Sequence, residues 1–173
     1  MKNKVFVTIQ LMVVLAIFPV LAIASGDEAP SVEEKMNGLQ AMCTETADAR
    51  TERQAAKSLY DRLGGYDRIH ALTTEIVRLH QINPDFRLMM KYVDGEHLAT
   101  SVADFIAAGT GGTEHYKGRG MRDAHSHLDF TDADFLSAGA DVGKAMKNQG
   151  YGQEETDEVI CILVSLKDQV VLK

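Results

Sequence analysis

The sequence predicts an all-α fold. Apolar residues recur three and four positions apart through most of the chain, which is the spacing of one face of a helix. Residues that cap helices begin several of these segments, and glycines end them. No stretch alternates for long with the period of two that is typical of a strand, so we expect no sheet.

The composition is that of one folded domain. Hydrophobic residues make up 45% of the 173 residues and charged residues 25%, a profile of globular rather than disordered chains. The 18 Lys and Arg against 25 Asp and Glu give a formal charge of −7. This charge argues against nucleic acid as the partner, because duplex binders need a basic face.

The N-terminus has the plan of a secretory signal peptide. Lys2 and Lys4 precede an uncharged, mostly apolar run over residues 5–24, and small residues place the cut after Ala24. An uncleaved membrane anchor is the alternative, but the run is only just long enough to cross a bilayer. We therefore expect a signal over residues 1–24, a periplasmic or secreted mature protein without a stable membrane span, and a mature charge of −9 (16 basic and 25 acidic residues).

The expected location bears on whether the two cysteines form a disulfide. Cys43 and Cys161 lie far apart in the sequence, and an oxidising compartment favours a disulfide between them. A bridge over so long a loop would contribute about 4 kcal/mol on the chain-entropy model. Two buried free thiols are the alternative.

The first helices belong to an N-terminal extension and to the start of the main domain. Ser31 and Glu34 have capping-box spacing, and the helix that they begin is expected to reach about Lys57 on the outside of the domain. We therefore assign residues 25–57 to an extension that contains this helix. A short segment over 58–63 then ends at a pair of glycines.

Two longer helices follow. The first runs from Tyr66 to about Ile82 and is stopped by an Asn-Pro pair. Asp94 can cap the second, whose shared face holds Leu98, Val102 and Phe105 and which ends at Gly109, Gly111 and Gly112.

The C-terminal part holds two more helices and an irregular stretch. Thr131 opens a helix that Gly150 closes, and a last helix runs from about Gln153 to Asp168. Residues 114–130, before them, are broken by glycines, rich in histidine and helical only over about 121–126. Such a loop is a common location for a site.

Histidine is the residue type in this sequence that offers the strongest candidates for a metal or haem ligand. His125 and His127 form a His-x-His pair, but on a helical turn the two rings point apart, and nothing completes a zinc triad. A Cys-x-x-Cys-His motif for covalent haem is absent. One buried histidine is nevertheless enough to hold a b-type haem, the alternative being a solvated or hydrogen-bonded side chain. Phosphate-loop, dinucleotide-binding and nucleophile-elbow motifs are also absent.

Four segments, and the ungapped spacing between them, resemble the group I truncated haemoglobins over residues 58–173. The matching segments are residues 58–65, 110–112, 116–125 and 150–155. The resemblance implies a two-over-two helical sandwich, to which the extension adds an extra N-terminal helix. It also implies a haem b cofactor and His125 as the proximal iron ligand. His127 then lies outside the pocket. The resemblance also implies a set of haem-contacting positions: Val77, Phe86, Met90, Leu98, Ser101, Val102, Phe105, Tyr116, Met121 and Phe135.

The chain departs from the family pattern on the distal side. The family's distal tyrosine position falls on Val77 and its wedge phenylalanine on Met90, while Leu98, Ser101 and Val102 occupy positions that normally offer Gln or His. A hydrogen bond to a charged ligand atom contributes about 1.5–3 kcal/mol. We therefore expect weak O2 retention, with CO and NO binding preserved.

His97 is a candidate for a sixth, distal ligand. It neighbours Leu98, and a small rotation of that helix would turn it toward the iron. The alternative is that it faces solvent or a haem propionate, because neighbours on a helix point about 100° apart.

These expectations leave three classes of function. The first is a haem protein that binds O2, NO and CO, and we favour such a binding protein over an enzyme of NO or peroxide chemistry. The second is a periplasmic redox or peroxidase-like haem protein with an unknown electron donor. The third is a haem-binding or degenerate globin that acts as an interaction module.

Overall fold

The computed structural model describes residues 29–172. The predicted signal peptide lies outside these residues, as does Lys173. The described chain is all helical, which confirms the predicted class. The elements are α1 (Val32–Glu45), α2 (Ala47–Ala56), α3 (Leu59–Leu63), α4 (Tyr66–Ile82), the 3-10 helix η1 (Met89–Tyr92), α5 (Gly95–Thr110), α6 (Met121–His125), α7 (Asp132–Asn148) and α8 (Gln153–Val170).

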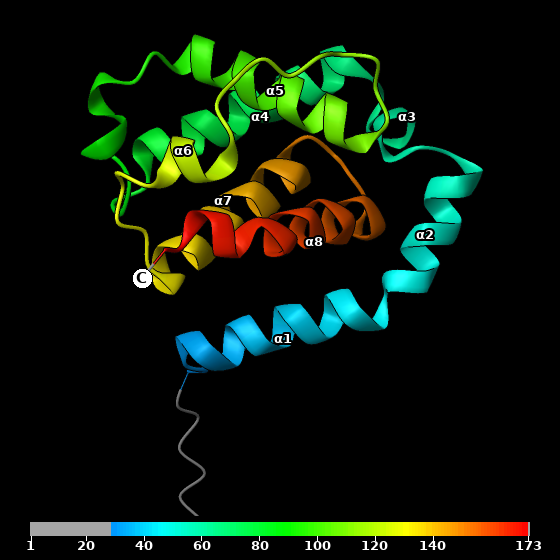
Figure 1. The fold of residues 1–173 in the computed structure, drawn as a ribbon, viewed down its shortest axis with the longest axis horizontal. Helices are drawn as coiled ribbons and strands as arrows, with labels where there is room; N and C mark the ends of the chain where they lie inside the picture. The colour runs from blue at the N-terminus through cyan, green and yellow to red at the C-terminus, as the bar shows by residue number, and fades with distance from the viewer. Residues whose placement is uncertain (1–28, 173) are drawn as a thin grey trace, which may run out of the picture.

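Two helix pairs form the body of the domain. Helices α4 and α5 pack side by side above the pair α7 and α8, and α6 lies at one edge between the two layers (Figure 1). Helix α4 joins the layers, because it packs on α7 as well as on α5. This arrangement is the two-over-two sandwich that the resemblance predicted.

The sequence pattern explains the long helices. The apolar stripe of α4 is buried, with Ile69 and Leu72 fully inaccessible. Thr131 and Asp134 form the capping box that begins α7. Gly150 ends α7 with a φ of 78°, and its N–H and that of Tyr151 bond to carbonyls of the last turn, as in a Schellman motif.

The N-terminal extension is two helices, so the prediction of one helix from Ser31 to Lys57 is wrong. Thr46 ends α1 with φ −93° and ψ 1°, and its hydroxyl donates to the carbonyl of Met42. The guanidinium of Arg50 donates to the carbonyl of Cys43 at 2.6 Å. These bonds satisfy the C-terminal carbonyls of α1 at a position without Gly or Pro.

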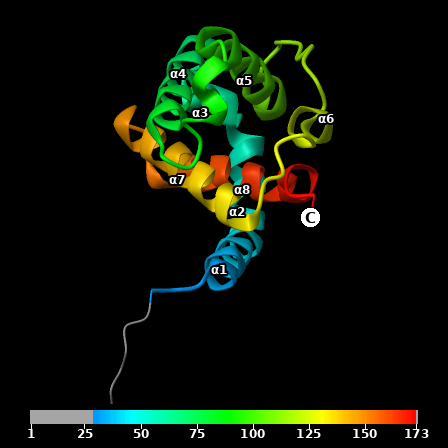
Figure 2. The same cartoon turned by 90° about the vertical axis from the view of Figure 1, so that its left-hand side faces the viewer.

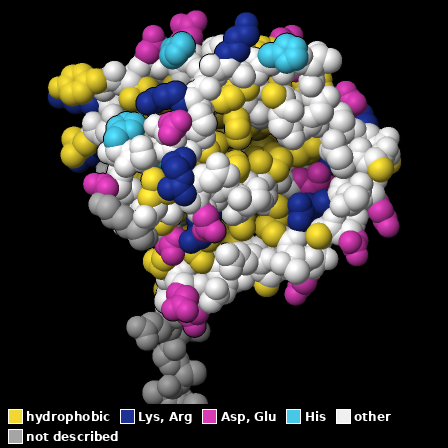
Figure 3. Space-filling view, in the orientation of Figure 1, with side chains coloured by type: hydrophobic (Ala, Val, Ile, Leu, Met, Phe, Trp, Pro, Cys, Tyr) yellow, Lys and Arg dark blue, Asp and Glu magenta, His cyan; other side chains and the backbone are white. Residues whose placement is uncertain are grey.

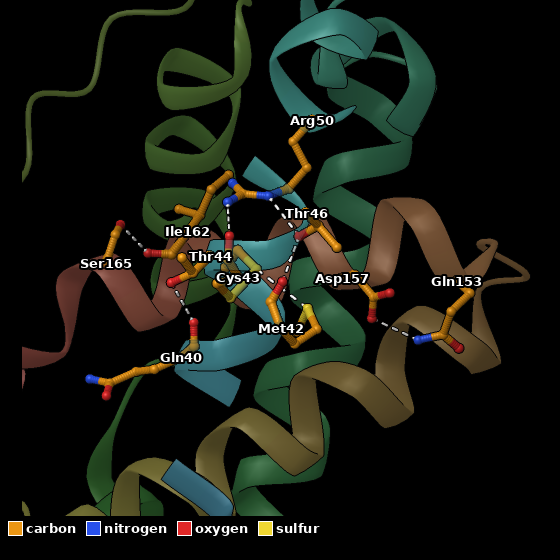
Figure 4. Close-up of a disulfide and its surroundings, with 11 residues drawn as sticks. Gln40, Met42, Cys43, Thr44, Thr46, Arg50, Gln153, Asp157, Ile162 and Ser165 are labelled. Atoms are coloured by element: carbon orange, nitrogen blue, oxygen red, sulfur yellow. Dashed lines mark hydrogen bonds between the residues drawn. A yellow bond between two sulfur atoms is a disulfide. The ribbon is translucent and has the colours of Figure 1, made fainter. Parts of the chain in front are cut away.

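Helix α1 lies outside the sandwich, against α7 and α8 (Figure 2). A disulfide joins Cys43 in α1 to Cys161 in α8, with the two Cα atoms 5.4 Å apart (Figure 4). The structure therefore has the bridge rather than the two free thiols. The bridge links the N-terminal extension covalently to α8, the last helix of the domain.

A buried carboxylate makes a second link to the extension. Glu158 in α8 is 5% exposed. Its Oε1 lies 2.6 Å from Nε of Arg53 in α2, and its Oε2 lies 2.5 Å from a guanidinium nitrogen of Arg62 in α3. Two charged partners compensate the burial of this carboxylate.

The three glycines at the C-terminal end of α5 have separate roles. Gly109 lies inside α5, which continues to Thr110, so this glycine does not end the helix, contrary to the prediction. Gly111 ends the helix with a φ of 108°. A Cβ on Gly112 would lie 2.6 Å from the ring of Tyr60, so only glycine fits there.

Candidate functional site

The site begins with the histidine at the end of α6. His125 is half-buried, and its Nδ1 lies 2.8 Å from the carbonyl oxygen of Met121, one turn earlier. A carbonyl only accepts hydrogen bonds, so Nδ1 carries the hydrogen and Nε2 keeps its lone pair. This is the tautomer in which an imidazole binds a metal ion through Nε2.

Aromatic contacts connect this imidazole to an apolar cluster. The ring of His125 lies 5.9 Å from that of Phe130, and Phe130 meets Phe86 edge-on at 5.9 Å between centroids. Phe86 is buried with Val77, Met90 and Ala99, and Leu98 packs against them. Four of the predicted haem-contacting residues therefore lie together, next to the predicted iron ligand.

The faces of α5 differ in the size of their residues. Ala99, Ala103 and Ala107 are buried, and small side chains allow α4 and α5 to approach closely. The predicted positions Leu98, Ser101, Val102 and Phe105 lie on the neighbouring face and are only half-buried. On the face of the molecule that Figure 3 shows, apolar side chains line a hollow between α5 and α8.

The other residues predicted to contact haem do not all lie at this site. Tyr116 packs edge-on against Phe105, with 5.2 Å between ring centroids, and its hydroxyl donates to the carbonyl of Arg119. Met121 is joined to His125 through its carbonyl group. Phe135 lines a groove between α1, α7 and α8, whereas the resemblance implied that it contacts haem.

His97 and His127 are both exposed. His97 lies in the first turn of α5, where its backbone N–H donates to the side chain of Asp94, as the predicted cap requires. Its exposed side chain corresponds to the solvent-facing alternative. His125 is half-buried whereas His127 is exposed, so the two histidines lie in different surroundings.

The sequence analysis missed Phe130, the residue that connects His125 to the apolar cluster. One signal was present: Phe130 directly precedes the capping box of α7, the position from which an apolar residue often packs back onto its helix. It also missed Ala138, which packs against the same cluster. Nothing in the local pattern of α7 distinguishes Ala138 from its neighbours.

The donor set fits haem better than a bare metal ion. Within residues 29–172, no three His, Cys, Asp or Glu side chains are grouped so that they could hold a metal. One imidazole with a free Nε2 beside an apolar cluster suits an iron that already has four ligands from a porphyrin. No helix in the described part of the chain is both long and apolar enough to span a bilayer.

Fold and site together define a two-over-two globin. The sequence profile of the bacterial-like globin family matches residues 58–171, and the chain belongs to that family.

Relatives agree with this assignment. The group 1 truncated haemoglobin of Tetrahymena thermophila is 23% identical over 106 residues, which cover 61% of this chain and 88% of the relative. The corresponding protein of Tetrahymena pyriformis is 25% identical over 104 residues, 60% of this chain and 83% of its own.

Solved structures show the same fold. The truncated haemoglobin of Tetrahymena pyriformis in its Fe(III) form superposes with a TM-score of 0.63 and 20% identity, over 66% of this chain and 98% of that one. The 2/2 haemoglobin of a Synechococcus species, in the cyanomet state with covalently attached haem, gives a TM-score of 0.62 and 24% identity over 67% and 99% of the two chains.

Proposed function

We propose that this protein binds haem b, with His125 as the iron ligand through Nε2. The observation that carries the proposal is the 2.8 Å bond from Nδ1 to the carbonyl of Met121, because it leaves Nε2 as the one free ring nitrogen. When bound, such a haem would supply an iron that can bind a diatomic gas. The apolar face of α5 and the cluster around Phe86 would bury the porphyrin.

The ligands that we propose are O2, CO and NO, with weak retention of O2. Val77, Leu98 and Val102 offer no hydrogen-bond donor toward a ligand. The nearby hydroxyl of Thr73 donates to the carbonyl of Ala99 at 2.8 Å, so it is already engaged inside the α4–α5 interface. Ser101 brings the one hydroxyl among the distal positions. A wall of this kind favours fast O2 release, because a donor is what retains this polarised ligand.

We also propose that the protein works outside the cytoplasm. The disulfide between Cys43 and Cys161 supports this location, because such bonds persist in oxidising compartments. N-terminal sequencing of protein recovered from the periplasm or medium tests the proposal: a mature chain beginning at Ser25 is expected. A chain that retains Met1, or that stays in the cytoplasm, would contradict it.

Haemin titration of purified His125→Ala and His127→Ala variants tests the haem site. We expect His125→Ala to weaken haemin binding about tenfold or more and to lose the Soret spectrum of a histidine-ligated haem. His127→Ala is the matched control, since its exposed ring lies two residues away on the same segment, and it should bind as the wild type does. Equal spectra and affinities for the two variants would overturn the proposal, and a wild-type chain that takes up no haemin would favour the interaction-module alternative.

A further inference from the structure

The groove between the N-terminal extension and the globin body is a preformed apolar site. It has a volume of about 780 Å³ and is bounded by α1, α7 and α8. Sites for small organic ligands typically have volumes of about 300–1,000 Å³. Helices α1 and α8 are joined by the Cys43–Cys161 disulfide, so two of its walls are fixed relative to each other.

The lining of the α1 groove is mostly aliphatic. Leu39 and Met42 come from α1, Leu136 from α7, and Ile160 and Leu163 from α8. Figure 4 shows Met42 beside the disulfide, with Gln153 and Asp157 nearby on α8. This surface offers a long alkyl chain many contacts and few hydrogen bonds.

Two glycines on facing helices keep the groove open. Gly38 in α1 and Gly139 in α7 both line it, and a Cβ on either would meet no atom within 4 Å. Both lie inside helices, where glycine is a poor helix former. Larger residues at these positions would therefore fill the groove without disturbing its walls.

The charges in the groove favour an anionic head group. Lys35 lies in the second turn of α1 and lines the groove, and within residues 29–172 no carboxylate lies close enough to form an ion pair with it. The groove's acidic residue, Asp157, is instead held by a hydrogen bond from Gln153 at 2.7 Å. Among the described residues, Lys35 is thus a cation without an ion-pair partner beside an apolar surface, which matches the head and tail of a fatty acid.

We propose that the α1 groove binds a single-chain carboxylate amphiphile, with its alkyl chain between α1, α7 and α8 and its carboxylate at Lys35. The site is separate from the face of α5 that we assign to haem, and the proposal does not depend on haem binding.

Calorimetric titration of the full mature chain with dodecanoate, with and without bound haemin, tests the proposal. We expect saturable binding of one molecule per chain that haemin leaves unchanged, and binding of dodecyltrimethylammonium that is about tenfold weaker or more. Dodecanoate binding that haemin abolishes would place the amphiphile in the hollow beside α5 and overturn the proposal. So would equal affinity for the two head groups, or no saturable binding.

Four substitutions locate the ligand. Gly38→Leu and Gly139→Leu should each weaken dodecanoate binding about tenfold or more, while Gly143→Leu, also on α7 and also free of neighbours, should leave it unchanged. Lys35→Met should abolish the preference for the anionic head group. Wild-type affinity in both groove-filling variants would overturn the proposal. A wild-type dimer that Gly139→Leu dissociates would also overturn it, because a second copy would then cover the groove.

Discussion

His125 shows how much a single side chain can determine. Its Nδ1–H is held by a carbonyl group one turn earlier in the same short helix, so the ring's tautomer is fixed locally. The apolar surroundings of the ring depend instead on Phe130 and on Phe86, which belongs to another part of the chain. The tautomer of His125 is therefore set by its own helix, whereas the apolar surroundings of the ring are set by the tertiary structure.

A donor restored at Val77 should slow O2 release. Val77 is 4% exposed and lies in the cluster with Met90. In Val77→Tyr, a hydrogen bond to the ligand would contribute about 1.5–3 kcal/mol, which slows release roughly 10- to 150-fold. Stopped-flow measurement of O2 release from the ferrous protein checks this. Val77→Phe is the matched control, since it adds the ring without the hydroxyl, and equal release rates in both variants would contradict the prediction.

At the scale of the helices, the sequence predicts an end correctly where the residues at that end cap or stop the helix. The sequence placed both ends of α4 correctly, because glycines precede it and an Asn-Pro pair follows it. The break between α1 and α2 carries no such marker. It depends on Thr46 and Arg50, which bond to carbonyls of α1. The 3-10 helix η1 was also missed, since a single short turn has no periodicity to detect.

Arg62 should be important for stability because it compensates a buried charge. Without it, the carboxylate of Glu158 keeps only Arg53, whose side chain is 26% exposed. Removing one partner of a buried ion pair typically costs about 3–5 kcal/mol, so Arg62→Met should lower the free energy of unfolding in urea by about 3 kcal/mol. Arg78→Met is the control: its side chain is 52% exposed, and the loss should be much smaller, because exposed ion pairs contribute little to stability. Similar losses in both variants would contradict the prediction.

Glu75 links α4 to α7 and gives the stability a pH dependence. Hydrogen bonds from Arg78 and Asn148 lower the pKa of Glu75 from 4.5 to about 2. The folded state thus gains stability above pH 4.5 and loses it as the pH falls toward 2. Because Arg78 is largely exposed, the contribution should be under about 1 kcal/mol.

Urea unfolding of wild type and Glu75→Gln checks this sign. The variant should be less stable at pH 7, and the difference should shrink as the pH falls from 4.5 to 2. Glu52→Gln, on the exposed surface of α2, is the control. A difference that grows on acidification would contradict the assignment.

On the scale of the whole molecule, the disulfide joins the extension to the globin domain. The cysteines are separated by 118 residues, so the bond restricts most of the unfolded chain. For a loop of this length, reduction should lower the free energy of unfolding by about 5 kcal/mol on the chain-entropy model. Urea unfolding with and without dithiothreitol measures the loss. The double variant Cys43→Ser and Cys161→Ser should not respond to the reductant, and equal midpoints for the oxidised and reduced wild type would contradict the prediction.

The sequence by itself determined the helical class and the limits of the long helices of the globin domain, whereas His125 as candidate iron ligand came from the resemblance to a known family. The class and the helix limits depend on caps, glycines and apolar spacing, which act over a few residues. Only the tertiary structure decided that Cys43 meets Cys161, that Phe130 joins His125 to Phe86, and that Phe135 lines the α1 groove. Such contacts bring together side chains from separate helices, and the packing of those helices is fixed by the complementarity of whole faces rather than by any local run of residues.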